Sequence, residues 1–390
     1  MRIAHICLSC FYNDGMNYQE NQLVRQHVAD GHDVLVLAST EVYNDKGQLT
    51  YRDPGDYMGT DGARVIRLPY STWLPHKVMR KLRFHPGVYD QIKAFAPDAI
   101  LFHGGCGAEI VTVARYVRDH PETIFYVDSH EDWTNSAKNF VSREILHRMF
   151  YGNRLRKALP QIDMVLCVTT DTMDFVEDLY RVSRDKLEFY PLGGYPLEDA
   201  DYHQRREAKR AELGIAPDMT LYAQTGKMRP HKRLSETLRA FKASAGVTDR
   251  FAIGGVLLDE TRDEVERLVA EDPRVVFLGW QSVEDLTDLL CAADIYLHPG
   301  RQSSTTQHSM CCRCALVLED LPAHWVFVKE TGWLVGFTAP LEPVFADAQN
   351  SDIEQMKQTS YALACSMLDY EVLAQRVLHR TSKPQNNSAG

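Results

Sequence analysis

The chain has 390 residues, of which 44% are hydrophobic, and this is enough to bury two ordinary cores. Its formal net charge of −10 excludes nucleic acid as the main partner, because binding to a phosphate backbone requires a basic face. No apolar run reaches the length of a bilayer span and the start of the chain lacks the pattern of a signal peptide, so a cytoplasmic location is expected.

The first half of the chain alternates apolar segments with helical patterns. Residues 3–8 predict a strand, residues 20–30 a helix and residues 34–38 a second strand, which together make a βαβ unit. Further strands are predicted at residues 64–67, 99–102, 124–127 and 164–168. This order is typical of a doubly wound α/β domain.

The second half repeats this plan after an irregular stretch at residues 193–201. Helices are predicted at residues 233–243 and 259–270, and strands at 220–224, 250–253, 275–278, 295–298 and 315–318. We therefore predict an N-terminal domain over residues 1–192, completed by a C-terminal helix at 366–381, and a second domain over residues 193–365.

The basic segment GKMRPHK, residues 226–232, follows the strand predicted at 220–224. Parallel sheets bind ligands at the carboxyl ends of their strands, and a glycine there lets the backbone approach the ligand. The ammonium groups of Lys227 and Lys232, helped by Arg229 beside Gly226, would grip a diphosphate. The alternative is a solvated basic turn, which the position in the sheet disfavours.

This segment resembles the Gly-Arg-x-x-x-x-Lys-Gly signature of the retaining, nucleotide-sugar-dependent glycosyltransferases of family four. Lys227 stands where arginine is usual, and Arg233 replaces the final glycine. Four other segments resemble family landmarks in the right order: FYNDGMNYQENQLVRQHVADGHDVLVLA, RVVFLGW, LLCAADIYLHP and ETGWLV. The resemblance implies the α/β GT-B architecture, in which two Rossmann-like doubly wound domains face a central cleft.

Two loops of the first half carry further candidates. The resemblance implies that Gly15 brings backbone amides near the donor phosphate and acceptor, whereas Asp14-Gly15 alone would be a turn. His130 follows the strand at 124–127, which favours a position facing the cleft, and the resemblance implies that it contacts the donor sugar. Asp128 and Glu131 are interpreted as partners of that histidine or as acceptor-binding carboxylates.

The segment after His298 departs most from the family. A Glu-x7-Glu pair usually contacts the sugar and the ribose, but this chain reads GRQSSTTQHSMCCRCALV and has no carboxylate there. Ser303, Ser304 and Thr305, just before a helix, are candidates for binding phosphate, and His308 aligns with the second glutamate. The departure allows another ribose contact, a different nucleotide or a loss of transfer.

Two basic and apolar runs, residues 77–84 and 141–160, would dock on an anionic membrane surface or pack as ordinary amphipathic helices. The cluster Cys311, Cys312 and Cys314 lacks a second pair at zinc-like spacing, and the nine cysteines of the chain fit reduced thiols. No metal and no cofactor is expected, because fixed cations can stabilise a departing phosphate.

The resemblance implies an enzyme that moves a sugar from a nucleotide sugar to a saccharide or lipid-linked acceptor, in glycan or polysaccharide biosynthesis at the inner face of the membrane. His130, Lys227 and Lys232 are the candidate catalytic residues, and the transition state would be oxocarbenium-like. Alternatives are a cytidine-monophosphate-sugar transferase, a sugar-nucleotide epimerase, or a degenerate subunit that binds without turnover.

Overall fold

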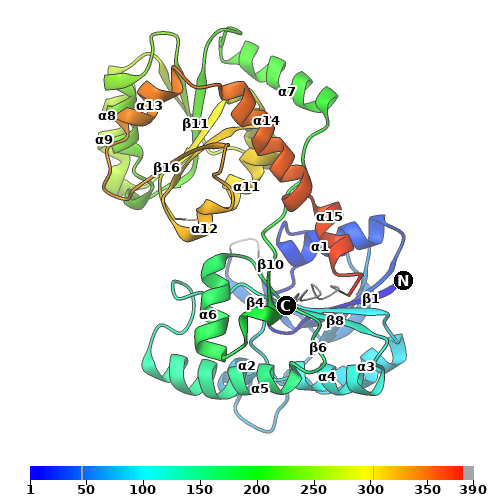
Figure 1. Cartoon of the computed structure of the whole chain (residues 1–390). Helices are drawn as coiled ribbons and strands as arrows, with labels where there is room; N and C mark the ends of the chain where they lie inside the picture. Colours follow the sequence, from blue (N-terminus) through cyan, green and yellow to red (C-terminus); the bar gives the residue numbers. More distant parts are fainter. Residues whose placement is uncertain (45–46, 302, 381–390) are drawn as a thin grey trace, which may run out of the picture. The chain divides into compact units, whose positions relative to one another are not determined.

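The structure is a computed structural model that describes residues 1–44, 47–301 and 303–380. The chain divides into two units: residues 1–191 with the C-terminal segment from residue 370 on, and residues 192–369. Each unit is built around its own sheet, flanked by helices (Figure 1).

The sheet of unit 1 has the strand order β10-β9-β8-β7-β1-β2-β6-β5, and only β5 runs antiparallel to its neighbour. Its strands are β1 (Arg2–Cys7), β2 (Asp33–Ser39), β5 (Gly55–Met58), β6 (Arg64–Leu68), β7 (Ala99–Phe102), β8 (Ile124–Ser129), β9 (Val165–Cys167) and β10 (Leu187–Phe189). A separate hairpin pairs β3 (Glu41–Tyr43) with β4 (Leu49–Tyr51). The short parallel strands are buried almost throughout, as expected for a sheet that helices cover on both faces.

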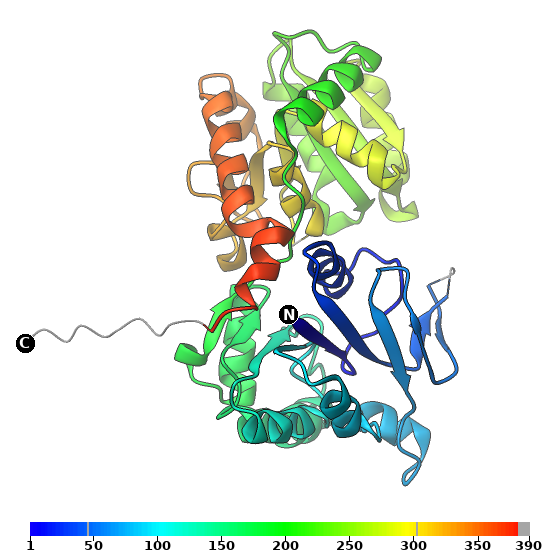
Figure 2. The same ribbon diagram turned by 90° about the vertical axis from the view of Figure 1, so that its right-hand side faces the viewer.

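The helices of unit 1 cover both faces of this sheet (Figures 1 and 2). One face packs on α3 (Val88–Phe95), α4 (Ile110–Asp119), α5 (Gly152–Ala158) and α6 (Thr170–Tyr180). The opposite face packs on α1 (Gln19–Ala29) and α15 (Tyr370–Arg376). The remaining helical segments are α2 (His76–Leu82), the π-helix η1 (Val141–Tyr151) and the short turn η2 (Arg184–Lys186).

The sheet of unit 2 is fully parallel and has the order β13-β12-β11-β14-β15-β16. Its strands are β11 (Leu221–Met228), β12 (Arg250–Leu257), β13 (Val275–Gly279), β14 (Ile295–His298), β15 (Ala315–Glu319) and β16 (Gly332–Val335). Its helical segments are α7 (Asp199–Glu212), η3 (Pro230–Lys232), α8 (Leu234–Ser244), α9 (Asp259–Glu271), α10 (Val283–Ala292), α11 (Ser304–Cys311), α12 (Pro322–Trp325), α13 (Glu342–Ala348), α14 (Ile353–Leu363) and η4 (Ala364–Leu368). Helices α8, α9 and α13 share the core of one face.

Two expectations about element limits need correction. The strand predicted to end at residue 224 continues to Met228, because Lys227 and Met228 stay paired with Val256 and Leu257 of β12. The helix predicted at 366–381 is interrupted, because Asp369 leaves the helical conformation and its neighbour Leu368 accepts a backbone hydrogen bond from Gly194. Residues 366–369 of the predicted helix therefore belong to unit 2, and α15 belongs to unit 1. Residue 381 lies outside the described residues.

Candidate functional site

In unit 2, the predicted phosphate-binding segment lies at the point where the strand order reverses. Strand β11 has β12 on one side and β14 on the other, and the chain continues from β11 to β12 but reaches β14 only later. At such a switch point the loops that follow the two central strands diverge and leave a crevice for ligands. The loops concerned are those that follow β11 and β14.

The Lys232 amine is held within this region by its own loop. Its Nζ donates to the carbonyl oxygen of Thr225 at 3.1 Å, and the side chain is half-buried. Gly226 has φ +110°, and a Cβ added there would lie 2.5 Å from Nζ. The glycine thus makes room for the amine as well as permitting the backbone conformation. Burial lowers the pKa of Lys232, which favours a ligand that restores negative charge beside it.

Other cations lie at the end of β11 and in the loops that follow β11 and β14. Lys227 and Arg229 are exposed, and Arg301 lies in the loop after β14. Burial, followed by the charges of Lys232, Arg301 and Arg229, lowers the pKa of His231. Gly300 lets the two loops meet, since an added Cβ would lie 2.5 Å from the carbonyl oxygen of His231. The result is a concentration of positive charge at one edge of the sheet.

The serine and threonine segment packs beside the same strands. Ser303 caps α11, its hydroxyl accepting from the backbone N–H of Thr305 at 3.4 Å, while Ser304 is exposed. The buried hydroxyl of Tyr296 in β14 lies near Thr225, Ser303 and Thr305, and burial raises the pKa of Tyr296 to about 12. The segment therefore lies at the carboxyl ends of β11 and β14, as a phosphate-binding role requires.

His308 is turned toward another helix. Its Nε2 lies 3.1 Å from the hydroxyl of Thr287 in α10, and burial lowers the pKa of His308. That contact involves neither the loop after β11 nor the loop after β14. His308 is thus the one candidate of this segment whose observed partner lies outside the crevice-forming loops.

The sequence search missed a carboxylate in unit 2. Glu319 ends β15, the strand next to β14, and is only 6% exposed. Burial raises the pKa of Glu319, while Arg233 and Arg301 oppose that rise. Its Oε2 has no hydrogen-bond partner among the described residues. A search limited to the segment after His298 could not find it, although a glutamate at the end of a predicted strand was a usable signal.

In unit 1, the corresponding region lies at the carboxyl ends of β1, β7 and β8. Gly15 is exposed in the loop between β1 and α1, with φ +76°. Its N–H faces Oδ2 of Asp61 at 3.5 Å, the limit of a hydrogen bond. Asp61 also accepts from Arg25 Nε at 2.7 Å, so this carboxylate ties the loop to α1.

His130 follows β8 directly and keeps part of its ring exposed. Its side chain is 41% exposed, and its Nε2 lies 3.7 Å from Oδ1 of Asp128. Burial disfavours the charged ring, but contact with Asp128 outweighs burial and raises the pKa of His130. The ring is therefore paired with a carboxylate on one side and accessible on the other.

The expectation that Asp128 and Glu131 bind an acceptor is not supported by their positions. Asp128 is 1% exposed, and its oxygens contact His103, the N–H of Gly104 and His130. The buried Glu131 accepts from Cys106 Sγ at 2.6 Å and from Ser129 Oγ at 2.5 Å. Both carboxylates are thus engaged inside unit 1, and Asp128 is the partner of His130.

Comparison with known proteins gives a family match that lies almost entirely within unit 1. Residues 14–193 match the family model described as a glycosyl transferase 4-like domain. The match covers most of the N-terminal part of unit 1. This match agrees with the resemblance to family-four glycosyltransferases that the motifs indicated. No curated protein sequence matches the chain.

Solved structures show the fold of the whole chain. A sucrose-phosphate synthase from Thermosynechococcus elongatus has 17% identity and a TM-score of 0.59, with 96% of this chain and 97% of that chain covered. WaaG, a glycosyltransferase involved in lipopolysaccharide biosynthesis, has 15% identity and a TM-score of 0.59, with 97% and 100% covered. HepE of Anabaena in complex with UDP has 15% identity and a TM-score of 0.61, with 97% and 98% covered. Both units are Rossmann-like, as in the GT-B fold.

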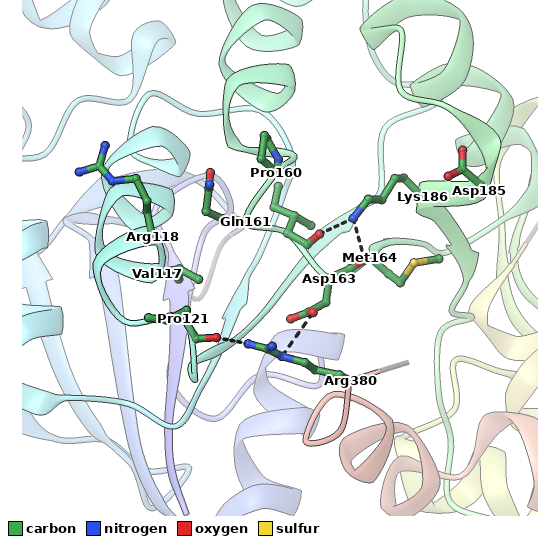
Figure 3. A pocket seen from close by; sticks show the side chains of 11 residues that line it. Val117, Arg118, Pro121, Pro160, Gln161, Asp163, Met164, Asp185, Lys186 and Arg380 are labelled. Atoms are coloured by element: carbon green, nitrogen blue, oxygen red, sulfur yellow. Dashed lines mark hydrogen bonds and ion pairs between the residues drawn. The ribbon is translucent and has the colours of Figure 1, made fainter. Parts of the chain in front are cut away.

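Unit 1 also has a pocket of about 450 Å³ at the opposite edge of its sheet (Figure 3). Its lining includes residues 160–164, just before β9, and Asp185 and Lys186, just before β10. Lys186 Nζ donates to the carbonyl oxygen of Ile162 at 2.8 Å, and Arg380 contacts Pro121 and Asp163. Lys186 and Arg380 are therefore engaged in contacts within unit 1. Parallel sheets bind ligands at the other edge, so this pocket is not our candidate site.

One helical segment of unit 1 exposes apolar side chains. Phe140, Val141, Ile145 and Met149 are each more than half exposed along η1. The basic residues Arg143 and Arg148 both pair with Glu144, which offsets part of their charge. Within the described ranges, no helix is long and apolar enough to cross a bilayer, and no group of three His, Cys, Asp or Glu side chains could hold a metal ion.

Proposed function

We propose that this chain is a retaining, metal-independent glycosyltransferase that moves a sugar from a nucleotide sugar to a saccharide or lipid-linked acceptor. The observation that carries the proposal is the half-buried Lys232 amine, which is held to Thr225 O beside Gly226. A fixed ammonium in a partly desolvated position stabilises the charge of a departing diphosphate. Structures of HepE with UDP, with UDP and glucose, and with UDP-glucose support a nucleotide sugar as the donor.

Lys227, Arg229 and Arg301 would add to the positive charge that receives the leaving group. They are exposed, so a phosphate that binds them would replace water around each of these side chains. Charge-assisted contacts of this kind are worth about 1.5–3 kcal/mol each when water is excluded. The hydroxyls of Ser303 and Thr305 and the N-terminus of α11 would bind the remaining phosphate oxygens.

Glu319 is our candidate for the carboxylate that the segment after His298 lacks. Its buried position at the end of β15 and its unpaired oxygen among the described residues suit a contact with ribose or sugar hydroxyls. Such hydroxyls donate well to a carboxylate that water does not reach. Arg301 and Arg233 would keep this carboxylate ionised against the effect of burial.

His130 would act on the sugar. Its exposed edge would contact sugar hydroxyls, and the Asp128 carboxylate behind it would stabilise positive charge on the ring. An oxocarbenium-like transition state changes the charge distribution of the sugar. An imidazole of fixed orientation can stabilise that change without having to reorient.

The acceptor side would lie near an anionic membrane surface, with the chain cytoplasmic and peripheral. The exposed apolar residues of η1 support this, and the exposed Lys77, Lys81 and Lys138 add basic charge in the neighbouring segments. A lipid-linked acceptor would then be met at the surface where it resides, as glycan assembly requires.

A panel of nucleotide sugars tests the proposal. Each donor, including cytidine-monophosphate sugars, would be assayed for slow hydrolysis and for thermal stabilisation of the protein. We expect hydrolysis and stabilisation with one class of diphosphate sugar. Stabilisation without hydrolysis by any donor would favour a binding subunit, and 2-epimerised product would favour an epimerase.

A further inference from the structure

A chain of three buried histidines runs from the carboxyl edge of the unit 1 sheet to the C-terminal helix. Asp128 Oδ2 lies 2.5 Å from His103 Nδ1, and His103 Nε2 lies 2.9 Å from His5 Nδ1. His5 Nε2 lies 2.9 Å from His27 Nδ1, and His27 Nε2 lies 3.1 Å from the carbonyl oxygen of Ala374 in α15. All three histidines are buried, with at most 2% of the residue exposed.

The two ends of this chain fix how many protons it contains. A backbone carbonyl and a carboxylate are both acceptors, so each end requires an N–H donor. The chain has four hydrogen bonds and each needs one proton, whereas three neutral imidazoles supply only three. One extra proton is therefore required, and it gives the chain a net positive charge when Asp128 is ionised.

The surroundings decide which ring carries this charge. His103 is the one of these three histidines that contacts the Asp128 carboxylate, while His5 lies between two other imidazoles. Burial opposes a charged His103, but Asp128 outweighs it and raises the pKa of His103 to about 9. Burial lowers the pKa of His27 to about 4, and burial with the charges of His27 and His103 lowers the pKa of His5. Other groups that influence these rings are Cys7, Glu20, Asp30 and His32.

We propose that His27 and His5 fix one excess proton on His103, and that this charge, acting through Asp128, sets the protonation of His130. These histidines are positioning residues, and their relevance to sugar transfer rests on the proposed role of His130. His103 and His130 share the Asp128 carboxylate, so a charge on one limits the charge on the other. The Ala374 carbonyl and the Asp128 carboxylate together set the directions of the hydrogen bonds between them, which couples the docking of α15 to the site.

Nitrogen NMR of the full chain labelled with ¹⁵N-histidine tests the proton count directly. In the unaltered protein at pH 7, both ring nitrogens of His103 should be protonated, and this signal should titrate near pH 9. His27→Phe leaves two hydrogen bonds for two rings, so His103 should become singly protonated at pH 7. The titration of His130 should then move to higher pH, because Asp128 loses its other cation.

Two variants complete the experiment. His27→Gln keeps a donor for Ala374 and an acceptor for His5, so it should retain the doubly protonated His103 and the His130 titration of the unaltered protein. His85→Gln, at a buried histidine outside the chain, should leave both signals unchanged. An unprotonated nitrogen on His103 of the unaltered protein at pH 7 would overturn the proposal.

The NMR signals do not depend on turnover. If no nucleotide sugar is hydrolysed or bound, the proposed function fails while the proton arrangement is still decided by His103. If transfer is observed but His27→Phe and His27→Gln share one His130 titration, the function stands and the histidine chain is only structural.

Discussion

The amine of Lys232 occupies the space that a side chain at position 226 would fill, since an added Cβ would lie 2.5 Å from Nζ. Gly226 is also in a backbone conformation, φ +110°, that residues with a Cβ rarely adopt. Position 226 therefore controls both the path of the strand end and the placement of the cation. This relationship makes the leaving-group assignment open to a direct test.

Gly226→Ala should weaken the binding of uridine or guanosine diphosphate at least tenfold, because the methyl group displaces the Lys232 amine. Calorimetry with the free diphosphate would measure it. Gly279→Ala is the matched control, because Gly279 also has positive φ, +71°, but has no atom within 4 Å of an added Cβ. If both variants lost diphosphate affinity equally, the loss would come from backbone strain and not from displacement of the Lys232 amine.

Lys232→Ala should cost more diphosphate affinity than Lys227→Ala, because the Lys232 amine is half-buried and oriented by Thr225 O while Lys227 is exposed. We expect a loss of about 1.5–3 kcal/mol for Lys232 and less for Lys227. Lys242→Ala, at an exposed lysine paired with Glu271, is the control and should bind normally. Undiminished binding by Lys232→Ala would remove the basis of the proposed site.

His130→Ala should abolish transfer or donor hydrolysis while leaving diphosphate affinity nearly intact, since the ring is assigned to the sugar and not to the phosphates. Steady-state rates and calorimetry on the same preparation would separate the two effects. His120→Ala, at a half-buried histidine stacked on Tyr116, is the control. Full activity in His130→Ala would make this histidine a structural residue.

Glu319→Gln should weaken the affinity for the nucleotide sugar about tenfold, because a neutral amide replaces a charged acceptor of hydroxyl protons. The substitution keeps the size of the side chain, so the melting temperature should change little. Asp320→Asn, at the neighbouring carboxylate that accepts from Trp325 Nε1 at 2.7 Å, serves as the control. A Glu319→Gln variant with normal donor affinity would contradict the proposed hydroxyl contact.

The histidine chain should give unit 1 a maximum of stability near pH 6.5. Above that pH the folded state keeps a proton on His103 that the unfolded state releases, so this contribution is lost as pH rises toward about 9. Below pH 6.5, the unfolded state binds protons at His5 and His27 that the folded state does not. The free energy of unfolding therefore decreases as the pH decreases.

Each such proton gives a slope of at most about 1.4 kcal/mol per pH unit, which urea unfolding at a series of pH values can resolve. His103→Asn should flatten the decline between pH 6.5 and 9. An identical alkaline decline in that variant would assign it to other groups.

Position 233 departs from the family signature in sequence but not in backbone conformation. Arg233 replaces the final glycine, yet it keeps a left-handed backbone with φ +56°. Its buried guanidinium donates to the carbonyl oxygens of Gly336 at 3.1 Å and Ala339 at 2.7 Å. Position 233 therefore has the left-handed conformation that suits a glycine, although it holds an arginine. The Arg233 side chain binds the loop that contains Gly336 and Ala339, a contact that the sequence did not predict.

By itself, the sequence predicted most strands of the two sheets and the two α/β units, and it placed His130 at the carboxyl edge of one sheet and Gly226 and Lys232 at the carboxyl edge of the other. Those features follow from local periodicity and from the rule that parallel strands end at one edge. Only the tertiary structure decided that Asp128 and Glu131 are internal partners and that Glu319 is a buried carboxylate with an unpaired oxygen among the described residues. It also assembled the histidine chain, in which 98 residues separate His5 from His103 and 347 separate His27 from Ala374. Burial and hydrogen bonding between such distant residues depend on how the helices pack on the sheet, which no local pattern records.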